Sequence, residues 1–453
     1  MDKITRILAA YAYDIDYGKL ASETIHEVKR RIIDSLGVAF AAYYSEPVIK
    51  SRRLASLYST ERGGRIIGTR YRVSPDWASF IDGIMIRYHD YNDTYLSKEP
   101  LHPSDMIAAA FGLGDTLNSS GMDIITSIAI GYEIAVTLCD AGSLRRRGWD
   151  HVNFLGIGSN ILSCKLLGLD LEKIQHSLSI YVVPHASMRQ TRVGELSMWK
   201  GSAAANSTRN AVFSALIARE GFTGPFKPFE GEMGFIKQLL QGDFDMKAFT
   251  SLEDKKTPLR ILDTYIKKYP VEYHAQTAVD AALKLREQVH VKDIEKILIE
   301  TFQAAYDIIG PKDPEKWDPH TKETADHSLM WIVAATLAWG NITIEKYQDI
   351  RNPQVLSLMK LMEVKVDPEI DEKYPRSFPN RITIKTRDGR RFTEEVEYAR
   401  GHPKNPMSDE EVEKKFNELT ENIIPRDQRR RLLEKIWRLE NYNIEEIIDD
   451  TVI

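Results

Sequence analysis

Apolar positions recur at helical spacing along most of the first 262 residues. Residues 25–42, IHEVKRRIIDSLGVAFAA, place basic residues opposite an apolar stripe, as in a helix packed on a core. Ser74 and Pro75 open another helical run, because proline suits the first turn of a helix. Two apolar runs, 104–117 and 122–142, are rich in Ala and Gly, which allow close helix–helix approach. The pattern predicts a mainly α-helical domain, residues 1–262.

The pattern changes after Leu262, where alternating and helical runs are interspersed. Residues 324–340, TADHSLMWIVAATLAWG, predict one long apolar helix. Short alternating runs predict strands at 296–302, 362–367, 381–386 and 390–399. The last two runs flank Arg387-Asp388-Gly389, a hairpin signal. This mixture predicts a smaller α+β domain, residues 263–404.

The C-terminal segment, residues 405–453, is helical again. Ser408 and Glu411 form the sequence signature of a capping box, which starts its first helix. Residues 426–440 are amphipathic with a basic face. We expect these helices to return to the helical domain and dock on it, rather than to bind a membrane or nucleic acid.

Composition narrows the class of protein. A chain of 453 residues suggests two domains, and its net charge of −5 argues against a nucleic-acid surface or a polybasic membrane patch. No run approaches ~20 continuous apolar residues, so we expect no transmembrane helix. The first 18 residues resemble a first helix rather than a secretory signal, which favours the cytoplasm.

The cysteines and histidines argue against a metal site. Cys139 and Cys164 both lie in apolar runs, so we expect two buried structural thiols. Two cysteines cannot supply the ligands of an iron–sulfur cluster and give no zinc spacing. The eleven histidines are scattered, with no pair four residues apart in an HExxH pattern. We therefore predict no metal and no other cofactor.

The most informative stretch is residues 88–105, YHDYNDTYLSKEPLHPSD. Asp90, Asp93 and Thr94 stand at i, i+3 and i+4, so a continuing helix would place them on one face. Pro103 suits the first turn of the next helix and leaves His102 at its cap. A neutral imidazole there can take or relay a proton. The alternative is an acidic helix followed by an ordinary capped turn.

Two later stretches supply cations and another imidazole. Residues 145–151, RRRGWDH, place His151 at a helix start, where the segment either binds an anion or is a solvated loop. Residues 188–201, MRQTRVGELSMWKG, carry Arg192 and Lys200. Lys200 opens a small-residue helix that should pack deeply, and a buried ammonium needs an anion. That anion is either a substrate or a protein carboxylate, Glu195 or Glu230.

Three more candidates open the second predicted domain. Lys267 and Lys268 precede a proline, and His274 precedes a helical run. They would lie at the entrance of this domain, near the hinge, and clefts between domains are common ligand sites. Cations of this kind hold carboxylates, and imidazoles move protons, so the whole set suits metal-free elimination on a small polycarboxylate. The candidates are Asp90, Thr94, His102, His151, Arg192, Lys200, Lys267, Lys268 and His274.

Long stretches of the chain resemble the MmgE/PrpD family, and within it the branch that acts on methylcitrate. The stretches run in family order from about residue 25 to residue 410. They are IIDSLGVAFAA, HDYNDT with LHPSD, RGWDHV, RQTRVGELSMWKG, FEGEMGF, YPVEYHAQTAVDAAL and KWDPHTKETADHSL.

The resemblance implies a fold, a reaction and a set of residues. It implies a helical domain built from both chain ends, an inserted α+β lid, a homodimer and a cofactor-free site between the domains. The implied reaction is dehydration of 2-methylcitrate to 2-methyl-cis-aconitate in propionate breakdown. The family's site residues match Asp90, Thr94, His102, His151, Lys200, Lys267 and His274. Trp331 stands where relatives often have tyrosine, and the spacing from Thr94 to His102 is longer than in the family's decarboxylases.

We therefore predict a hydro-lyase acting on a tricarboxylate. His102 or Asp90 would remove the proton beside a carboxylate, and His151 or His274 would assist loss of the hydroxyl. The cations Arg192, Lys200, Lys267 and Lys268 would hold the carboxylates. The alternatives are a citrate dehydratase, a cis-aconitate decarboxylase and a non-catalytic helical binding or scaffold protein.

Overall fold

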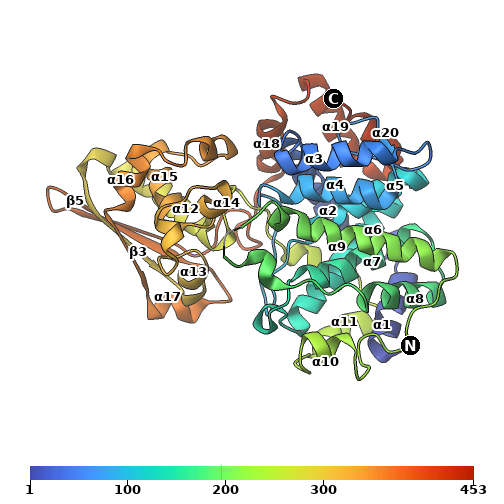
Figure 1. Cartoon of the computed structure of the whole chain (residues 1–453). Helices are drawn as coiled ribbons and strands as arrows, with labels where there is room; N and C mark the ends of the chain where they lie inside the picture. The colour runs from blue at the N-terminus through green and yellow to red at the C-terminus, as the bar shows by residue number, and fades with distance from the viewer. Residues whose placement is uncertain (195) are drawn as a thin grey trace. The chain divides into compact units, whose positions relative to one another are not determined.

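A computed structural model describes residues 1–194 and 196–453 (Figure 1). They form two compact units. The first comprises Met1–Gly194, Met198–Thr264 and Ser408–Ile453, and the second is formed mainly by Tyr265–Met407. The domain division drawn from the sequence, after residues 262 and 404, stays a prediction.

The first unit is helical, as the apolar periodicity predicts. A two-stranded ribbon, β1 with β2, is its sheet structure within the described residues. The elements are α1 Lys3–Asp14, α2 Ser22–Ala41, α3 Glu46–Ala55, β1 Gly64–Arg65, β2 Arg72–Val73, α4 Pro75–Arg87, α5 Ile107–Leu117, α6 Gly121–Ala141, α7 Val152–Leu166, α8 Leu171–Val182, α9 Trp199–Arg219, α10 Phe235–Leu239, α11 Thr250–Glu253, α18 Asp409–Thr420, α19 Arg426–Trp437 and α20 Ile444–Asp449.

Small residues allow the central helices to approach closely. α4 begins at Pro75, as predicted, and packs against α5 and α9. A Cβ at Gly83 on α4 would lie 2.9 Å from the Cβ of Ala205 on α9, so only glycine fits this crossing. α6 is long and apolar enough to cross a membrane by length and composition, yet 89% of its most apolar window is buried. It is a core helix of this unit, packed against α7.

The C-terminal segment Ser408–Ile453 belongs to the helical unit. Ser408 and Glu411 make both hydrogen bonds of the capping box at the start of α18. α18 and α19 pack against α2, and Leu432 and Ile436 on α19 are buried. The free thiols of Cys139 and Cys164 are buried in the helical unit, which confirms their structural environment.

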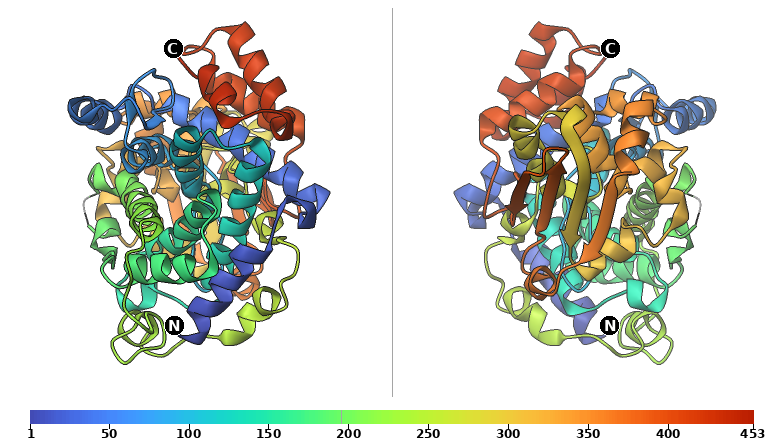
Figure 2. Two further views of the ribbon diagram at one scale, coloured as in Figure 1. Left: turned by 90° about the vertical axis from the view of Figure 1, so that its right-hand side faces the viewer. Right: turned by 90° about the vertical axis from the view of Figure 1, so that its left-hand side faces the viewer.

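The second unit combines helices with a four-stranded sheet in the order β4-β3-β5-β6. β4 runs parallel to β3, and the other neighbours are antiparallel, with the predicted hairpin joining β5 to β6 (Figure 2, right). α12 packs against β5, β6 and α15. The elements are α12 Gln276–Gln288, β3 Ile294–Thr301, α13 Gln303–Ile308, α14 Lys322–Ala325, α15 Leu329–Trp339, α16 Pro353–Met359, β4 Met362–Val366, α17 Pro368–Lys373, β5 Asn380–Thr386 and β6 Arg391–Val396.

Two predicted helices are wrong in extent. α4 ends at Arg87, so Asp90, Asp93 and Thr94 do not share a helical face. The run 324–340 is not one helix either. It is divided by Ser328, whose side chain accepts a hydrogen bond from the Trp331 amide and caps a new helix, α15.

Candidate active site

The loop after α4 carries three of the predicted residues. Asp90 adopts a left-handed backbone conformation, φ 52°, which ends the helical path. Tyr95 and Leu101 then exchange two backbone hydrogen bonds of 2.8 and 2.9 Å. The Thr94 hydroxyl donates to the Leu101 carbonyl at 3.0 Å. These bonds close the loop and bring its end, His102, back beside its beginning.

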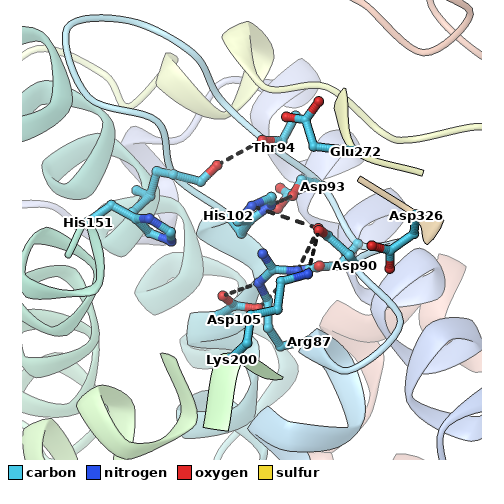
Figure 3. Close-up of polar contacts among 12 residues, drawn as sticks. Arg87, Asp90, Asp93, Thr94, His102, Asp105, His151, Lys200, Glu272 and Asp326 are labelled. Carbon is cyan, nitrogen blue, oxygen red and sulfur yellow. Dashed lines mark hydrogen bonds and ion pairs between the residues drawn. The ribbon is translucent and has the colours of Figure 1, made fainter. Parts of the chain in front are cut away.

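Asp90 is a buried carboxylate held by two buried cations. Arg87 Nη1 donates to Asp90 Oδ1 at 2.6 Å, and Lys200 Nζ donates to Asp90 Oδ2 at 3.0 Å (Figure 3). All three side chains are at most 5% exposed. Lys200 therefore pairs with Asp90, which the sequence interpretation did not name as its anion. Glu230 instead accepts hydrogen bonds from the amides of Lys3 and Ile4, and Glu195 lies outside the described residues.

His102 is oriented by the backbone of its own loop. Its Nδ1 lies 2.8 Å from the Asp93 carbonyl, which only accepts, so Nδ1 carries the proton. Nε2 lies on the other side of the ring, 3.9 Å from Asp90 Oδ1. Asp93 is itself fixed, since its carboxylate accepts from the Ser104 amide at 2.8 Å and the Tyr132 hydroxyl at 2.7 Å. His102 thus directs its Nε2 toward the Asp90 carboxylate.

His151 lies at the start of α7, as predicted, between a carboxylate and a guanidinium. Its Nδ1 is 3.2 Å from Asp150 Oδ1, and Arg192 Nη2 donates toward its Nε2 at 3.5 Å. Arg192 Nε also bonds Asp150. Burial, and then the charge of Arg192, lower the pKa of His151 to about 3. The ring is therefore neutral near neutral pH.

These contacts join most of the predicted residues into one group. The rings of His102 and His151 meet edge to face, with centroids 5.7 Å apart. Contacts therefore run continuously from Lys200 through Asp90, His102 and His151 to Arg192. The helical-unit cluster consists of Asp90, His102, His151, Arg192 and Lys200, and Thr94 lies in the loop that carries Asp90 and His102.

The remaining predicted residues belong to the second unit. His274 is 3% exposed and lies in a short 3₁₀ turn before α12, where Nδ1 is 2.7 Å from Glu272 Oε1. Lys267 is also buried, and its charge acts on Glu272. Lys268 is half-buried with its ammonium over the Tyr269 ring. The second-unit cluster consists of Lys267, Glu272 and His274.

The sequence interpretation missed the carboxylates and the arginine that hold the candidates in place. Asp150 and Glu272 stand one and two residues before their histidines, a signal that could have been used. Arg87 follows only from the structure, as does Asp105, which lies 3.7 Å from it. Burial raises the pKa of the Asp105 carboxyl to about 7, against the opposing effect of Arg87.

Trp331, expected to bear on the substrate or the reaction step, is a core residue. It is fully buried, its indole N–H donates to the Ile350 carbonyl at 2.9 Å, and it stacks on Tyr347. Among the residues described, no group of three or more His, Cys, Asp or Glu side chains is arranged to hold a metal ion.

Fold and contacts define a two-unit protein with a buried acid–base cluster in its helical unit. Residues 6–247 match the MmgE/PrpD N-terminal domain, and residues 269–440 match the MmgE/PrpD C-terminal domain. The chain belongs to the MmgE/PrpD family.

Curated relatives align with this chain over most of their length. The 2-methylcitrate dehydratase of Escherichia coli K12 is 29% identical over 480 aligned positions, which cover 97% of this chain and 95% of that protein. The protein from Cupriavidus necator with the same name is 29% identical, covering 85% and 84%. The "probable 2-methylcitrate dehydratase" of Saccharomyces cerevisiae is 28% identical, covering 88% and 82%.

Proposed function

We propose that this protein is a hydro-lyase that dehydrates 2-methylcitrate to 2-methyl-cis-aconitate, using its own acid–base groups. The observation that carries the proposal is the helical-unit cluster, where imidazoles, a carboxylate and cations are in contact. The names of the full-length relatives supply the substrate. The step belongs to propionate breakdown by the methylcitrate route.

We assign removal of the substrate proton to His102 rather than to Asp90. Both oxygens of Asp90 are engaged by cations, Arg87 and Lys200, which stabilise its anionic form and leave it a weak base. His102 instead has its Nδ1 proton held by the Asp93 carbonyl, so its neutral form has a lone pair on Nε2. A neutral imidazole with one lone pair is suited to accept a proton from carbon beside a carboxylate.

We assign assistance to the departing hydroxyl to His274 rather than to His151. His151 is neutral, its Nε2 accepts from Arg192 and its one proton, on Nδ1, faces Asp150, so it has no proton on Nε2 to give. Because His151 lies between Asp150 and Arg192, it is suited to orient the other residues of the helical-unit cluster. Arg192, Lys200, Lys267 and Lys268 would bind the carboxylates of the substrate through charge-assisted hydrogen bonds.

A substrate panel tests the reaction. The purified protein is incubated with 2-methylcitrate, citrate, isocitrate and cis-aconitate, and the conjugated product is followed by ultraviolet absorbance. Fastest product formation from 2-methylcitrate is the expected result. Carbon dioxide release from cis-aconitate would identify a decarboxylase, and fastest turnover of citrate would identify a citrate dehydratase. Either result contradicts the proposal.

Two variants test whether the cluster performs the reaction. His102→Gln and Lys200→Ala should each lower kcat/KM for 2-methylcitrate by about 10²-fold or more, as for loss of a catalytic base or a charge-assisted contact. The exposed residues His290 and Lys247 supply the matched controls His290→Gln and Lys247→Ala. A non-catalytic scaffold would show no turnover in the parent protein.

We further propose that the protein is a homodimer, as the family resemblance implies, and that it is located in the cytoplasm. Sedimentation analysis should give twice the mass of the chain, about 104 kDa from 51.8 kDa per chain. A monomer across the working concentration range would contradict this part of the proposal, and cell fractionation tests the compartment.

A further inference from the structure

Glu272 makes two hydrogen bonds to the same histidine. Its Oε2 accepts from the His274 backbone N–H at 2.8 Å, and its Oε1 lies 2.7 Å from His274 Nδ1. Burial opposes ionisation, but the charge and hydrogen bond of His274 and the charges of His327 and Lys267 together lower the pKa of Glu272 to about 2. The side chain is therefore a carboxylate, which only accepts, so His274 Nδ1 carries a proton.

The surroundings fix both partners. The backbone N–H of Glu272 donates to the Asp326 carbonyl at 2.9 Å, just before α15. Asn380 Nδ2 donates to the His274 carbonyl at 2.8 Å. The His274 ring lies against Phe302, with centroids 5.3 Å apart. The Glu272 backbone, the His274 backbone and the His274 ring are thus each fixed by a contact.

The other ring nitrogen of His274 is kept open. Nε2 is buried, and no described residue supplies it with a hydrogen-bond partner. A buried polar atom without a partner is costly, so such atoms are uncommon unless they serve a function. An imidazole held by a carboxylate at one nitrogen and open at the other is the arrangement used for proton transfer.

We propose that Glu272 is a positioning residue that fixes His274 with a proton on Nδ1 and directs Nε2 to the substrate. The inference rests on the proposed function for its reaction. In that reaction Nε2–H gives its proton to the departing hydroxyl, the C–O electron pair stays with oxygen, and water leaves. The carboxylate of Glu272 balances the ring's positive charge before the transfer.

Glu272→Gln tests the role of the carboxylate. The amide is neutral and can itself donate to Nδ1, so it neither balances the positive charge of the ring nor requires a proton on Nδ1, while it nearly keeps the shape of the side chain. We expect kcat for 2-methylcitrate to fall about 10²- to 10⁴-fold with KM changed less than threefold, by analogy with loss of the carboxylate in a catalytic triad. Glu272→Asp, which keeps the charge, should recover part of the loss.

Two comparisons separate positioning from a structural effect. The double variant Glu272→Gln/His274→Gln should lose no more activity than His274→Gln alone, because the two residues act as a unit. Glu287→Gln, at an exposed position on α12, is the matched control and should leave kcat unchanged. Additive losses, or an unchanged kcat in Glu272→Gln, would overturn the inference.

A spectroscopic readout does not depend on turnover. Nitrogen NMR of the ¹⁵N-histidine-labelled protein, assigned with His274→Gln, reports which ring nitrogen of His274 carries the proton. We expect the proton on Nδ1 in the parent protein and a changed spectrum in Glu272→Gln. A His274 ring with no proton on Nδ1 in the parent overturns the inference. If 2-methylcitrate is not a substrate, the proposed function fails while this measurement still tests Glu272.

Discussion

At the scale of single residues, neighbours decide what each imidazole can do. His102, His151 and His274 each have one nitrogen assigned by a partner, a backbone carbonyl or a carboxylate. Their differences lie at the second nitrogen. It faces Asp90 in His102, accepts from Arg192 in His151, and has no partner among described residues in His274. Three histidines thus have three different capacities for proton transfer.

The neutral state of His151 predicts how the stability of the protein depends on pH. Its folded pKa is about 3, below the ordinary value of 6.5, so between these values the unfolded chain binds more protons. This residue therefore costs stability as the pH falls from 6.5 toward 3, by about 1.4 kcal/mol per pH unit. His151→Gln removes this cost. The melting temperature of the variant minus that of the parent should therefore increase as the pH is lowered from 7.5 to 5.

Thermal unfolding of parent and variant across this pH range gives the measurement. His290→Gln, at an exposed position, is the control and should keep a constant difference from the parent. A difference for His151→Gln that stays level, or that grows more negative on acidification, would show that His151 is protonated in the folded protein.

At the scale of elements, the sequence predicted helix boundaries well where neighbouring residues determine them. The proline at the start of α4 and the capping box of α18 are short-range features, and both are found. The end of α4 is different, because Asp93 bonds the Ser104 amide and the Tyr132 hydroxyl, both distant in sequence. Those contacts hold the loop away from the helical path. Helical spacing therefore identified residues of the site but not their arrangement.

Glu99 links two elements that carry site residues. It lies in the loop between Thr94 and His102, and its carboxylate accepts from the Arg145 amide at 2.9 Å and the Ser143 hydroxyl at 3.1 Å. Arg145 belongs to the turn that leads to His151. Burial raises the pKa of Glu99 to about 7 despite these hydrogen bonds. The loop and the turn are therefore joined by a carboxyl group that titrates near neutral pH.

We expect Glu99→Gln to change how stability depends on pH. Between the ordinary value of 4.5 and about 7, the folded state binds more protons than the unfolded state, so ionisation of Glu99 lowers stability as the pH rises. The amide never ionises. The melting temperature of the variant, relative to the parent, should therefore increase from pH 5 to pH 8 by several degrees, about 2–3 kcal/mol in free energy.

The exposed residue Glu61 supplies the control, Glu61→Gln, which should give a level difference over the same range. Differential scanning fluorimetry at each pH is sufficient. If Glu99→Gln instead loses stability progressively above pH 7, the carboxylate form must be the stabilising one, and the link between loop and turn depends on its charge.

At the scale of the whole chain, the C-terminal segment supports the loop that carries Asp90. Lys415 on α18 forms a buried ion pair with Asp34 on α2, Nζ to Oδ1 2.6 Å. The same ammonium donates to the Tyr91 carbonyl at 2.8 Å and lies over the Tyr91 ring. A residue near the end of the chain thus holds both an early helix and the residue next to Asp90. The sequence predicted the return of this segment but not this contact.

Lys415→Met should therefore destabilise the protein far more than its position near the C-terminus suggests. It leaves the Asp34 carboxylate buried without this cation, and breaking a buried pair on one side costs about 3–5 kcal/mol. Lys414 is 74% exposed on its side chain, so Lys414→Met should change the free energy of unfolding by less than about 0.5 kcal/mol. Asp34→Asn combined with Lys415→Met should recover part of the loss, because the uncompensated charge is gone. Denaturant unfolding of the three variants measures these differences, and equal stability of Lys415→Met and Lys414→Met would mean that the C-terminal helices are held by apolar packing alone.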